Sequence, residues 1–210
     1  MLKRSAPHFH GRTLPTGARA SRAERGVVAV EAALVSTLLF TILAGVVDVS
    51  MLFRTTYEVS SASRAGARLA AQEPLAPTFA HDAAVQVATS LEGMDYARVT
   101  KLWVYKANPS SPTGEPASDS NCTSGLRCVS FTVSADAQGH PVVSAGSGSW
   151  TGRKACATDP VAGVDQVDAV GVRVAYRHDA PIMFFEGQLV QETTTMRLEQ
   201  LSTALVCTSS

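Results

Sequence analysis

The longest apolar run in the chain extends from Val27 to Val47 and reads VVAVEAALVSTLLFTILAGVV. A helix of that length, at about 1.5 Å per residue, spans about 31 Å, which matches a hydrocarbon core of about 30 Å. Glu31 is the only charged residue inside the run, and Asp48 follows its end. The pattern therefore predicts a transmembrane helix over residues 27–47.

The helical period continues past this run in a different form. Small and apolar residues recur there at spacings of three and four: Leu52, Thr55, Val59, Ala62, Gly66 and Leu69. This spacing predicts that residues 48–72 continue the helix and present one narrow seam. Too few turns carry large apolar residues for an intermolecular coiled coil, so the seam is expected to pack on the protein's own sheet. The prolines from Glu73-Pro74 onward should end the helix.

The remainder of the chain reads as a short helix and a set of strands. Thr78 is a candidate cap for a helix that runs to about Leu91, and Gly93 should stop it. Alternating runs predict strands at Val99, 102–105, 128–133, 142–143, 169–176 and 193–198. Clusters rich in Gly, Ser and Pro over 108–120 and 139–152 predict loops, and 183–190 predicts a short helix or an irregular connection. The fold class is α+β, with a long N-terminal helix packed on a small antiparallel sheet.

The charge is divided unevenly along the chain. Residues 1–26 hold six of the 18 basic residues and one of the 18 acidic ones, which leaves 12 basic and 17 acidic residues in 27–210. Basic flanks stay in the cytoplasm, so residues 1–26 should be cytoplasmic and the C-terminal domain extracytoplasmic. That domain lacks the basic footprint of a nucleic-acid binder. A removed signal peptide is the alternative to a retained anchor, but an apolar core of 7–15 residues and a small-residue cleavage site are typical of such peptides, and this run is longer and carries Glu31.

Two segments of the helical region carry a family resemblance. The first is Arg25-Gly26 followed by VVAVEAALV, and the second is the small-residue and arginine segment over residues 63–71. At these separations the segments resemble the TadE-like family of the tight-adherence (Tad or Flp) pilus assembly systems, whose members are described as minor pseudopilins. The resemblance covers residues 25–72 and implies a type IV pilin-like architecture. It also implies other pilus subunits or platform proteins, and membrane lipid, as partners.

The resemblance to type IV prepilins implies a processing site. A prepilin peptidase would cut after Gly26, so Val27 would become the first residue of the mature chain and Glu31 the fifth. Cleavage would create an α-ammonium group, and a carboxylate four residues away can pair with an ammonium of the same or a neighbouring helix. Such a pair would offset the cost of placing both charges in lipid and would set the register of assembly.

All four cysteines lie in the part predicted to be outside: Cys122, Cys128, Cys156 and Cys207. An even number in an oxidising compartment predicts disulfides, and no CxxC or HxxxH spacing supports the rival interpretation of a metal site. Three pairings are open. Cys122 with Cys128 is preferred for its local loop, which leaves Cys156 with Cys207.

The sequence contains no catalytic signature. GxSxG, HExxH and P-loop motifs are missing, Gly146 to Trp150 reads as a turn-rich loop, and the aspartates at 159, 165 and 168 do not match a calcium-binding loop. The aromatic residues Trp103, Tyr105, Trp150 and Tyr176 are expected in the sheet and core. We therefore expect no enzyme, cofactor or metal.

The predicted organisation has four parts: a cytoplasmic leader over 1–26, the transmembrane helix over 27–47, its extracytoplasmic continuation over 48–72, and an α+β domain over 73–210. The expected function is a membrane-anchored pseudopilin-like subunit for assembly of a Tad/Flp-type pilus. The alternative is an anchored extracytoplasmic domain that binds a surface or cell-wall ligand.

Overall fold

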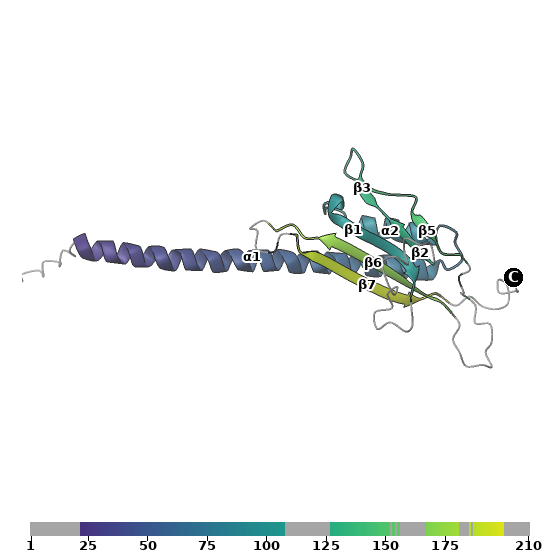
Figure 1. Ribbon diagram of the computed structural model, residues 1–210, viewed down its shortest axis with the longest axis horizontal. Helices are drawn as coiled ribbons and strands as arrows, with labels where there is room; N and C mark the ends of the chain where they lie inside the picture. Colours follow the sequence, from purple (N-terminus) through teal and green to yellow (C-terminus); the bar gives the residue numbers. More distant parts are fainter. Residues whose placement is uncertain are drawn as a thin grey trace, which may run out of the picture. The chain divides into compact units, whose positions relative to one another are not determined.

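A computed structural model describes residues 22–107, 127–151, 153, 155, 167–180, 185 and 187–199, with side chains from residue 26 onward. The chain divides into two compact units, Met1–Leu43 and Ala44–Ser210. The elements, in chain order, are α1 (Arg22–Gln72), α2 (Phe79–Ser90), the 3₁₀ turn η1 (Tyr96–Arg98), β1 (Val99–Lys106), β2 (Cys128–Phe131), β3 (Val133–Ala135), β4 (Pro141–Val143), β5 (Ser147–Ser149), β6 (Ala169–Arg177) and β7 (Leu189–Arg197) (Figure 1).

Helix α1 contains the whole apolar run and the small-residue seam, as the periodicity predicts. It ends at Gln72, just before the Glu73-Pro74 step that disfavours helical backbone. Two carbonyls of its last turn have partners: the Glu73 N–H donates to Leu69 at 3.3 Å and the Glu199 N–H donates to Ala71 at 2.8 Å. The second bond ties the chain after β7 to the end of α1.

Helix α2 forms where the sequence predicts it. Thr78 is the N-cap residue, but its side chain makes no capping hydrogen bond. At the other end, the Leu91 N–H donates to the carbonyls of Val87 and Ala88. Gly93 follows with a φ of 91°, a left-handed conformation that favours glycine and stops the helix.

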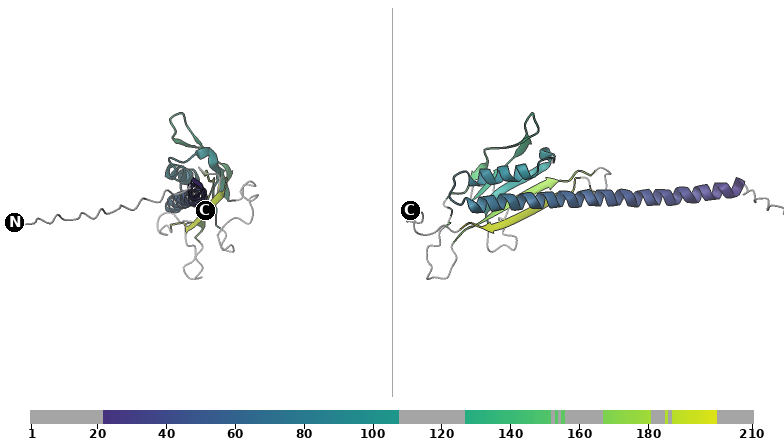
Figure 2. Two further views of the ribbon diagram at one scale, coloured as in Figure 1. Left: turned by 90° about the vertical axis from the view of Figure 1, so that its left-hand side faces the viewer. Right: turned by 180° about the vertical axis from the view of Figure 1, so that it is seen from behind.

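The main sheet has five strands in the order β5-β2-β1-β6-β7, and every pairing in it is antiparallel. Strand β1 lies at the centre, where Val104 is opposite Val129 of β2 and Val172 of β6. Helix α2 and the part of α1 within the second unit cover one face of this sheet (Figure 2). The predicted α+β class, with a long N-terminal helix and a small antiparallel sheet, is confirmed.

Three strand predictions were wrong in detail. The run 128–133 is not one strand, because the chain leaves the main sheet at Thr132 and residues 133–135 pair with β4 in a separate two-stranded sheet. Residues 147–149, predicted as loop, form β5 and pair with β2. Strand β7 begins at Leu189, four residues before the predicted start. The loop predicted over 108–120 lies outside the described residues.

The small-residue seam is buried against the protein's own elements, as predicted. Val59, Ala62 and Gly66 have no or almost no exposed surface, and Val59 and Ala62 belong to the main core cluster. A Cβ at Gly66 would lie 2.4 Å from Cγ2 of Val87 and 3.6 Å from Cγ1 of Val172. Glycine at this position therefore lets α1 approach both α2 and β6.

The other face of the sheet carries a second buried cluster of Trp103, Tyr105 and Cys128. A Cβ at Gly171 would lie 2.4 Å from the Tyr105 ring, so the glycine makes room for that ring across the β1–β6 pair. Trp150 and Tyr176 are buried in the main cluster. The prediction that these aromatic residues belong to sheet and core is confirmed.

Candidate functional site

The predicted processing site lies inside helix α1 rather than in an extended segment. Gly26 is four residues after the helix start at Arg22, and both Gly26 and Val27 are exposed. A Cβ built at Gly26 would meet no atom within 4 Å. Glycine within a helix costs about 0.5–1 kcal/mol relative to alanine, so the first turns of α1 are the easiest part of the helix to unwind. Access of a peptidase to the bond after Gly26 would require that unwinding.

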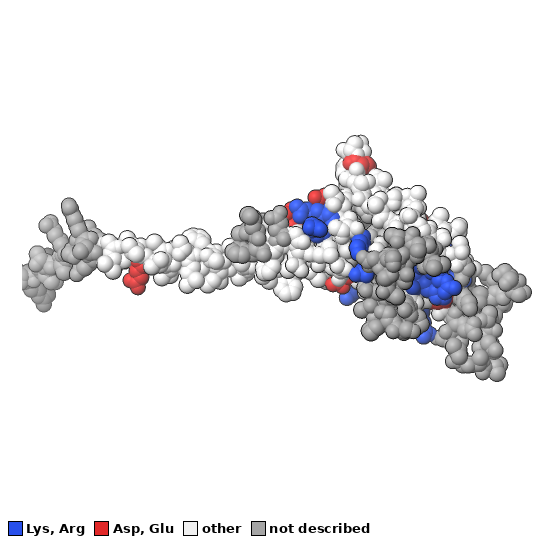
Figure 3. Space-filling view, viewed as in Figure 1, with Lys and Arg blue, Asp and Glu red and all other residues white. Residues whose placement is uncertain are grey.

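Glu31 is exposed one turn after Val27 on the same helix. Among the described residues it makes no ion pair or hydrogen bond. Side chains four apart on a helix have Cβ atoms about 5–6 Å apart, so a charged group at position 27 would be within reach of the Glu31 carboxylate. Figure 3 shows the N-terminal part of α1 as an uncharged surface interrupted by one acidic patch, and Glu31 is the only charged residue in the sequence between 26 and 47.

Three hydroxyl groups within and just after the apolar run, those of Thr37, Thr41 and Ser50, donate hydrogen bonds inside the helix. Thr37 donates to the Leu34 carbonyl at 2.9 Å, and Thr41 donates to the Thr37 carbonyl at 2.8 Å. Ser50 donates to the Val46 carbonyl at 2.7 Å. Such bonds make these hydroxyls compatible with lipid, where an unpaired polar group is costly. Glu31 differs from Thr37 and Thr41 in the same run, because its carboxylate has no such partner among the described residues.

The described part of the chain contains one helix that is long and apolar enough to cross a membrane, Gly26–Gln72. Its most apolar stretch has no buried residue. A core helix of a soluble protein would be covered on one face, whereas a fully exposed apolar surface needs lipid or a partner around it. The N-terminal helix thus indicates membrane anchoring.

Cys128 is disulfide-bonded and lies at the start of β2. Its partner lies outside the described residues, as do Cys122, Cys156 and Cys207, so the predicted pairing stays a prediction.

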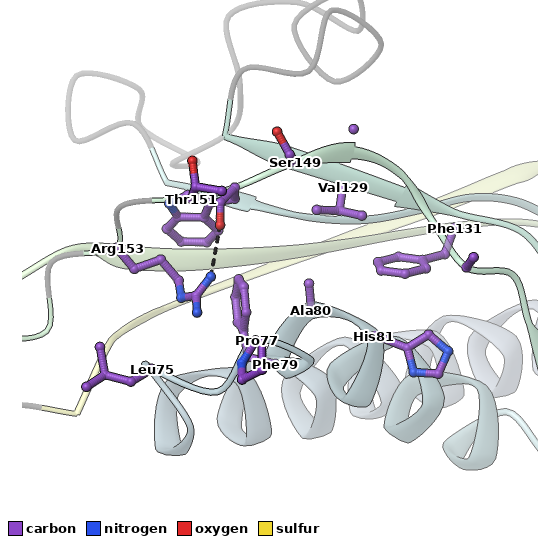
Figure 4. Close-up of a pocket in the computed structure, with 13 residues that line it drawn as sticks. Leu75, Pro77, Phe79, Ala80, His81, Val129, Phe131, Ser149, Thr151 and Arg153 are labelled. Atoms are coloured by element: carbon purple, nitrogen blue, oxygen red, sulfur yellow. Dashed lines mark hydrogen bonds between the residues drawn. The ribbon is translucent and has the colours of Figure 1, made fainter.

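A second candidate site is a groove of about 590 Å³ between the start of α2 and the β2–β5 edge of the sheet. Figure 4 shows Phe79, Ala80 and His81 on the α2 side, facing Val129 and Phe131 on the sheet side. The rings of Phe79 and Trp150 meet edge to face at 5.3 Å between centroids. The described lining contains no acidic residue.

Arg153 occupies one end of this groove, but its guanidinium group is engaged in structural contacts. It donates to the carbonyls of Pro74 at 2.6 Å, Ala76 at 2.9 Å and Trp150 at 2.9 Å, the last drawn as a dashed line in Figure 4. It also lies 3.9 Å from the centroid of the Phe79 ring. Burial lowers the pKa of Arg153 from its ordinary value. No local pattern in the sequence predicts these hydrogen bonds of Arg153, because Pro74 and Ala76 are far from it along the chain.

The other candidate ligands remain dispersed. Among the described residues, no group of three or more His, Cys, Asp or Glu side chains could hold a metal ion. Of the three aspartates weighed as a calcium loop, Asp168 is described, and it is buried in an ion pair with Lys106. His178 is also buried, with Nδ1 2.9 Å from the hydroxyl oxygen of Thr55.

Comparison with known protein families gave one match, to the family described as TadE-like protein, over residues 26–68. This range begins at the predicted processing glycine and covers most of α1, so the predicted resemblance to that family is confirmed. The match supports a function related to Tad pili. No curated protein and no solved structure matched the chain.

Proposed function

We propose that this protein is a membrane-anchored pseudopilin-like subunit for assembly of a Tad/Flp-type pilus. The observation that carries the proposal is the TadE-like match over 26–68, combined with the exposed apolar run 27–47 of α1, which contains one carboxylate, Glu31. No comparable observation favours the alternative, a domain that binds a surface or cell-wall ligand. The guanidinium group of Arg153 lies in the groove, but it is bonded to three carbonyl groups of its own chain.

In the proposed topology the leader 1–26 is cytoplasmic, residues 27–47 cross the membrane once, and residues 48–72 and 73–210 are extracytoplasmic. The basic residues of the leader support this orientation. A prepilin-type peptidase removes the leader after Gly26. The chain thereafter begins at Val27, with its α-ammonium one helical turn from Glu31.

The ammonium group and the carboxylate then have two ways to pair, within one helix or between neighbouring helices. A charge in the middle of a spanning helix costs about 2.5–3.5 kcal/mol on insertion scales, and less near the helix end. Pairing between helices would recover that cost only when a second subunit is in register. Glu31 is therefore the proposed assembly residue, with other pilus subunits or platform proteins as partners.

The processing step is tested by N-terminal sequencing of the membrane fraction, with and without the peptidase. We expect Val27 as the first residue only when the peptidase is present. Gly26→Val should block the cut, because a β-branched side chain hinders both unwinding and close approach to the backbone. Gly45→Val is the matched control, since Gly45 lies in the same helix and its Cβ would also meet nothing within 4 Å. An N-terminus at Met1 in the presence of the peptidase would refute processing, and one near Asp48 would indicate an ordinary secreted protein.

The assembly step is tested separately with Glu31→Gln, which keeps the side-chain size and removes the charge. We expect normal cleavage and membrane insertion but loss of co-purification with the pilus machinery. Glu58→Gln is the control, because this carboxylate lies on the same helix and pairs with Arg54 instead. Retention of Glu31→Gln in the complex would remove the assembly role of the carboxylate.

A further inference from the structure

Helix α1 has two different faces after the predicted membrane span ends at Val47. On one side Asp48, Thr55 and Val59 are buried within the second unit. On the other side Phe53 is 71% exposed and Tyr57 is 74% exposed. Asp48, which ends the apolar run in the sequence, therefore does not end the apolar surface. That surface extends ten residues further, on the side that the domain leaves uncovered.

A third exposed aromatic residue, Phe185, is linked to the same part of α1 through hydrogen bonds of His178. His178 contacts Thr55 through Nδ1, as described above, and its backbone pairs with the turn: the His178 N–H donates to Gln188 at 2.8 Å and the Gly187 N–H donates to His178 at 2.9 Å. Within this turn Phe185 is 37% exposed, and its carbonyl accepts from the Gln188 N–H at 3.3 Å. These bonds connect the backbone of Phe185, through Gln188 and His178, to Thr55 in the first turns of α1 that follow the span.

We propose that Phe53, Tyr57 and Phe185 form a lipid-interface surface, here called the aromatic collar, that rests in the headgroup region of the bilayer. The inference rests on the proposed membrane anchoring of α1. The occupant is lipid because the collar continues directly from the predicted span, with exposed Val49 and Met51 between them. Aromatic rings are the side chains that concentrate at membrane–water interfaces.

The depth of the collar agrees with this occupant. Six residues separate Val47 from Phe53 and ten separate it from Tyr57, which at the helical rise gives about 9 Å and about 15 Å. Long side chains on a helix lean toward its N-terminus, so both rings lie closer to the bilayer than their Cα atoms. The headgroup region on each side of the hydrocarbon core is about 5–7 Å thick. The Phe53 ring would reach this region, and Tyr57, farther along the helix, would lie on the water side of its outer edge.

The exposed side of α1 becomes polar immediately above the collar. Ser61, Arg64 and Arg68 are exposed there, and Arg54 makes an exposed ion pair with Glu58 at 2.8 Å beside the two rings. A surface that packed a second helix along its length would be expected to stay apolar or small through these positions. The change from rings to arginines over two turns instead matches the change from lipid to water.

Fluorescence quenching by brominated lipid tests the collar in the full-length protein. Single variants Phe53→Trp and Phe185→Trp are reconstituted in phosphatidylcholine vesicles without bromine or with bromine at positions distributed along the whole acyl chain. Leu39→Trp, inside the span, is the positive control, and Leu75→Trp, exposed beyond the far end of α1, is the negative control. The emission of the parent protein is subtracted, since its own Trp103 and Trp150 are buried. Circular dichroism verifies that each variant is folded.

We expect brominated lipid to reduce the emission of tryptophan at 53 and 185 to a level between the two controls. Emission at both positions equal to that of Leu75→Trp, with Leu39→Trp quenched, would overturn the collar and leave the anchor intact. Quenching at position 53 but not at position 185 would show that Phe185 does not belong to the collar. Emission at 53 that is unquenched and shifts with protein density in the vesicle would assign the surface to a second copy of the chain. Absence of quenching at Leu39→Trp would refute the proposed anchoring itself.

Discussion

Replacement of Gly66 by alanine should loosen the packing of α1 on α2. The added Cβ would lie 2.4 Å from Cγ2 of Val87 and 3.0 Å from the carbonyl oxygen of Ala83. Neither atom can move easily. Valine is confined to essentially one χ1 rotamer in a helix, and the carbonyl belongs to the backbone of α2. The substitution therefore has to push the two helices apart.

The size of the effect follows from two opposing contributions. Overpacking by one methyl group in a close-packed core costs about 1–3 kcal/mol. Alanine in a helix gains about 0.5–1 kcal/mol over glycine. The net loss of unfolding free energy should lie between about 0 and 2.5 kcal/mol, with a midpoint of about 1 kcal/mol. Each kcal/mol lowers the melting temperature by about 2–4 °C in a chain of this size.

A double-mutant cycle with Val87→Ala isolates the contact. Val87 is fully buried, and removal of its two methyl groups should cost about 2 kcal/mol through lost burial and a cavity. In the double variant the methyl group at position 66 occupies part of that cavity. The double variant should therefore lose about 1–2 kcal/mol less unfolding free energy than the sum of the two single variants. Thermal unfolding of the reconstituted protein measures all three losses.

Gly45→Ala is the control, because this glycine lies in the same helix with nothing within 4 Å of its Cβ. It adds only the helical gain of alanine and should therefore not lower the melting temperature of the domain. Additivity of Gly66→Ala and Val87→Ala within about 0.5 kcal/mol would show that the two positions are independent, and the explanation of the glycine by close approach would be wrong.

Three further predictions concern single side chains. Ser63→Ala should cost about 1–2 kcal/mol in thermal unfolding, since it removes the 2.8 Å bond between the buried Ser63 hydroxyl and Thr194; an unchanged melting temperature would contradict this. Arg153→Lys should cost about 2 kcal/mol, because lysine cannot reach three carbonyls at once, whereas Arg54→Lys on the exposed surface should leave stability unchanged. Hydrogen bonds from backbone N–H groups in its loop lower the pKa of Asp136 below its ordinary 3.8; the stabilisation is present above the unfolded pKa and lost as the pH falls through the folded pKa, and an NMR midpoint at or above 3.8 would contradict it.

The sequence was most informative where one period governed a long segment. The spacing of Val59, Ala62 and Gly66 predicted a buried seam on the protein's own elements, and the step at Pro74 predicted the end of α1, because both signals are local and steric. The spacing did not identify what Gly66 accommodates. Val87 comes from another helix, and only the packed structure brings its methyl group to the seam.

The three-residue strand β5 could not be predicted, for a physical reason, although β4 forms where the strand at 142–143 was predicted. Ser147 to Ser149 has the composition of a turn, and it becomes β5 because β2 offers it hydrogen-bonding partners at Cys128 to Ser130. The alternation over 128–133 is continuous, yet the chain changes sheet at Thr132, whose N–H bonds to the Ser144 side chain. In both places tertiary pairing, which no local pattern encodes, decides the structure.

The candidate site shows the same division between local and tertiary information. Glu31 could be singled out from the sequence because a lone carboxylate in an apolar run is a local anomaly. The burial of Asp48 could not be predicted, because a polar residue that ends an apolar run has the same sequence pattern whether water or protein surrounds it. Its burial beneath the domain moves the apparent boundary of the apolar surface outward, to Phe53 and Tyr57. Hydropathy alone therefore assigns a membrane boundary correctly only when all faces of a helix are equally exposed. From Asp48 onward one face of α1 is buried and the opposite face is exposed, so α1 does not meet this condition.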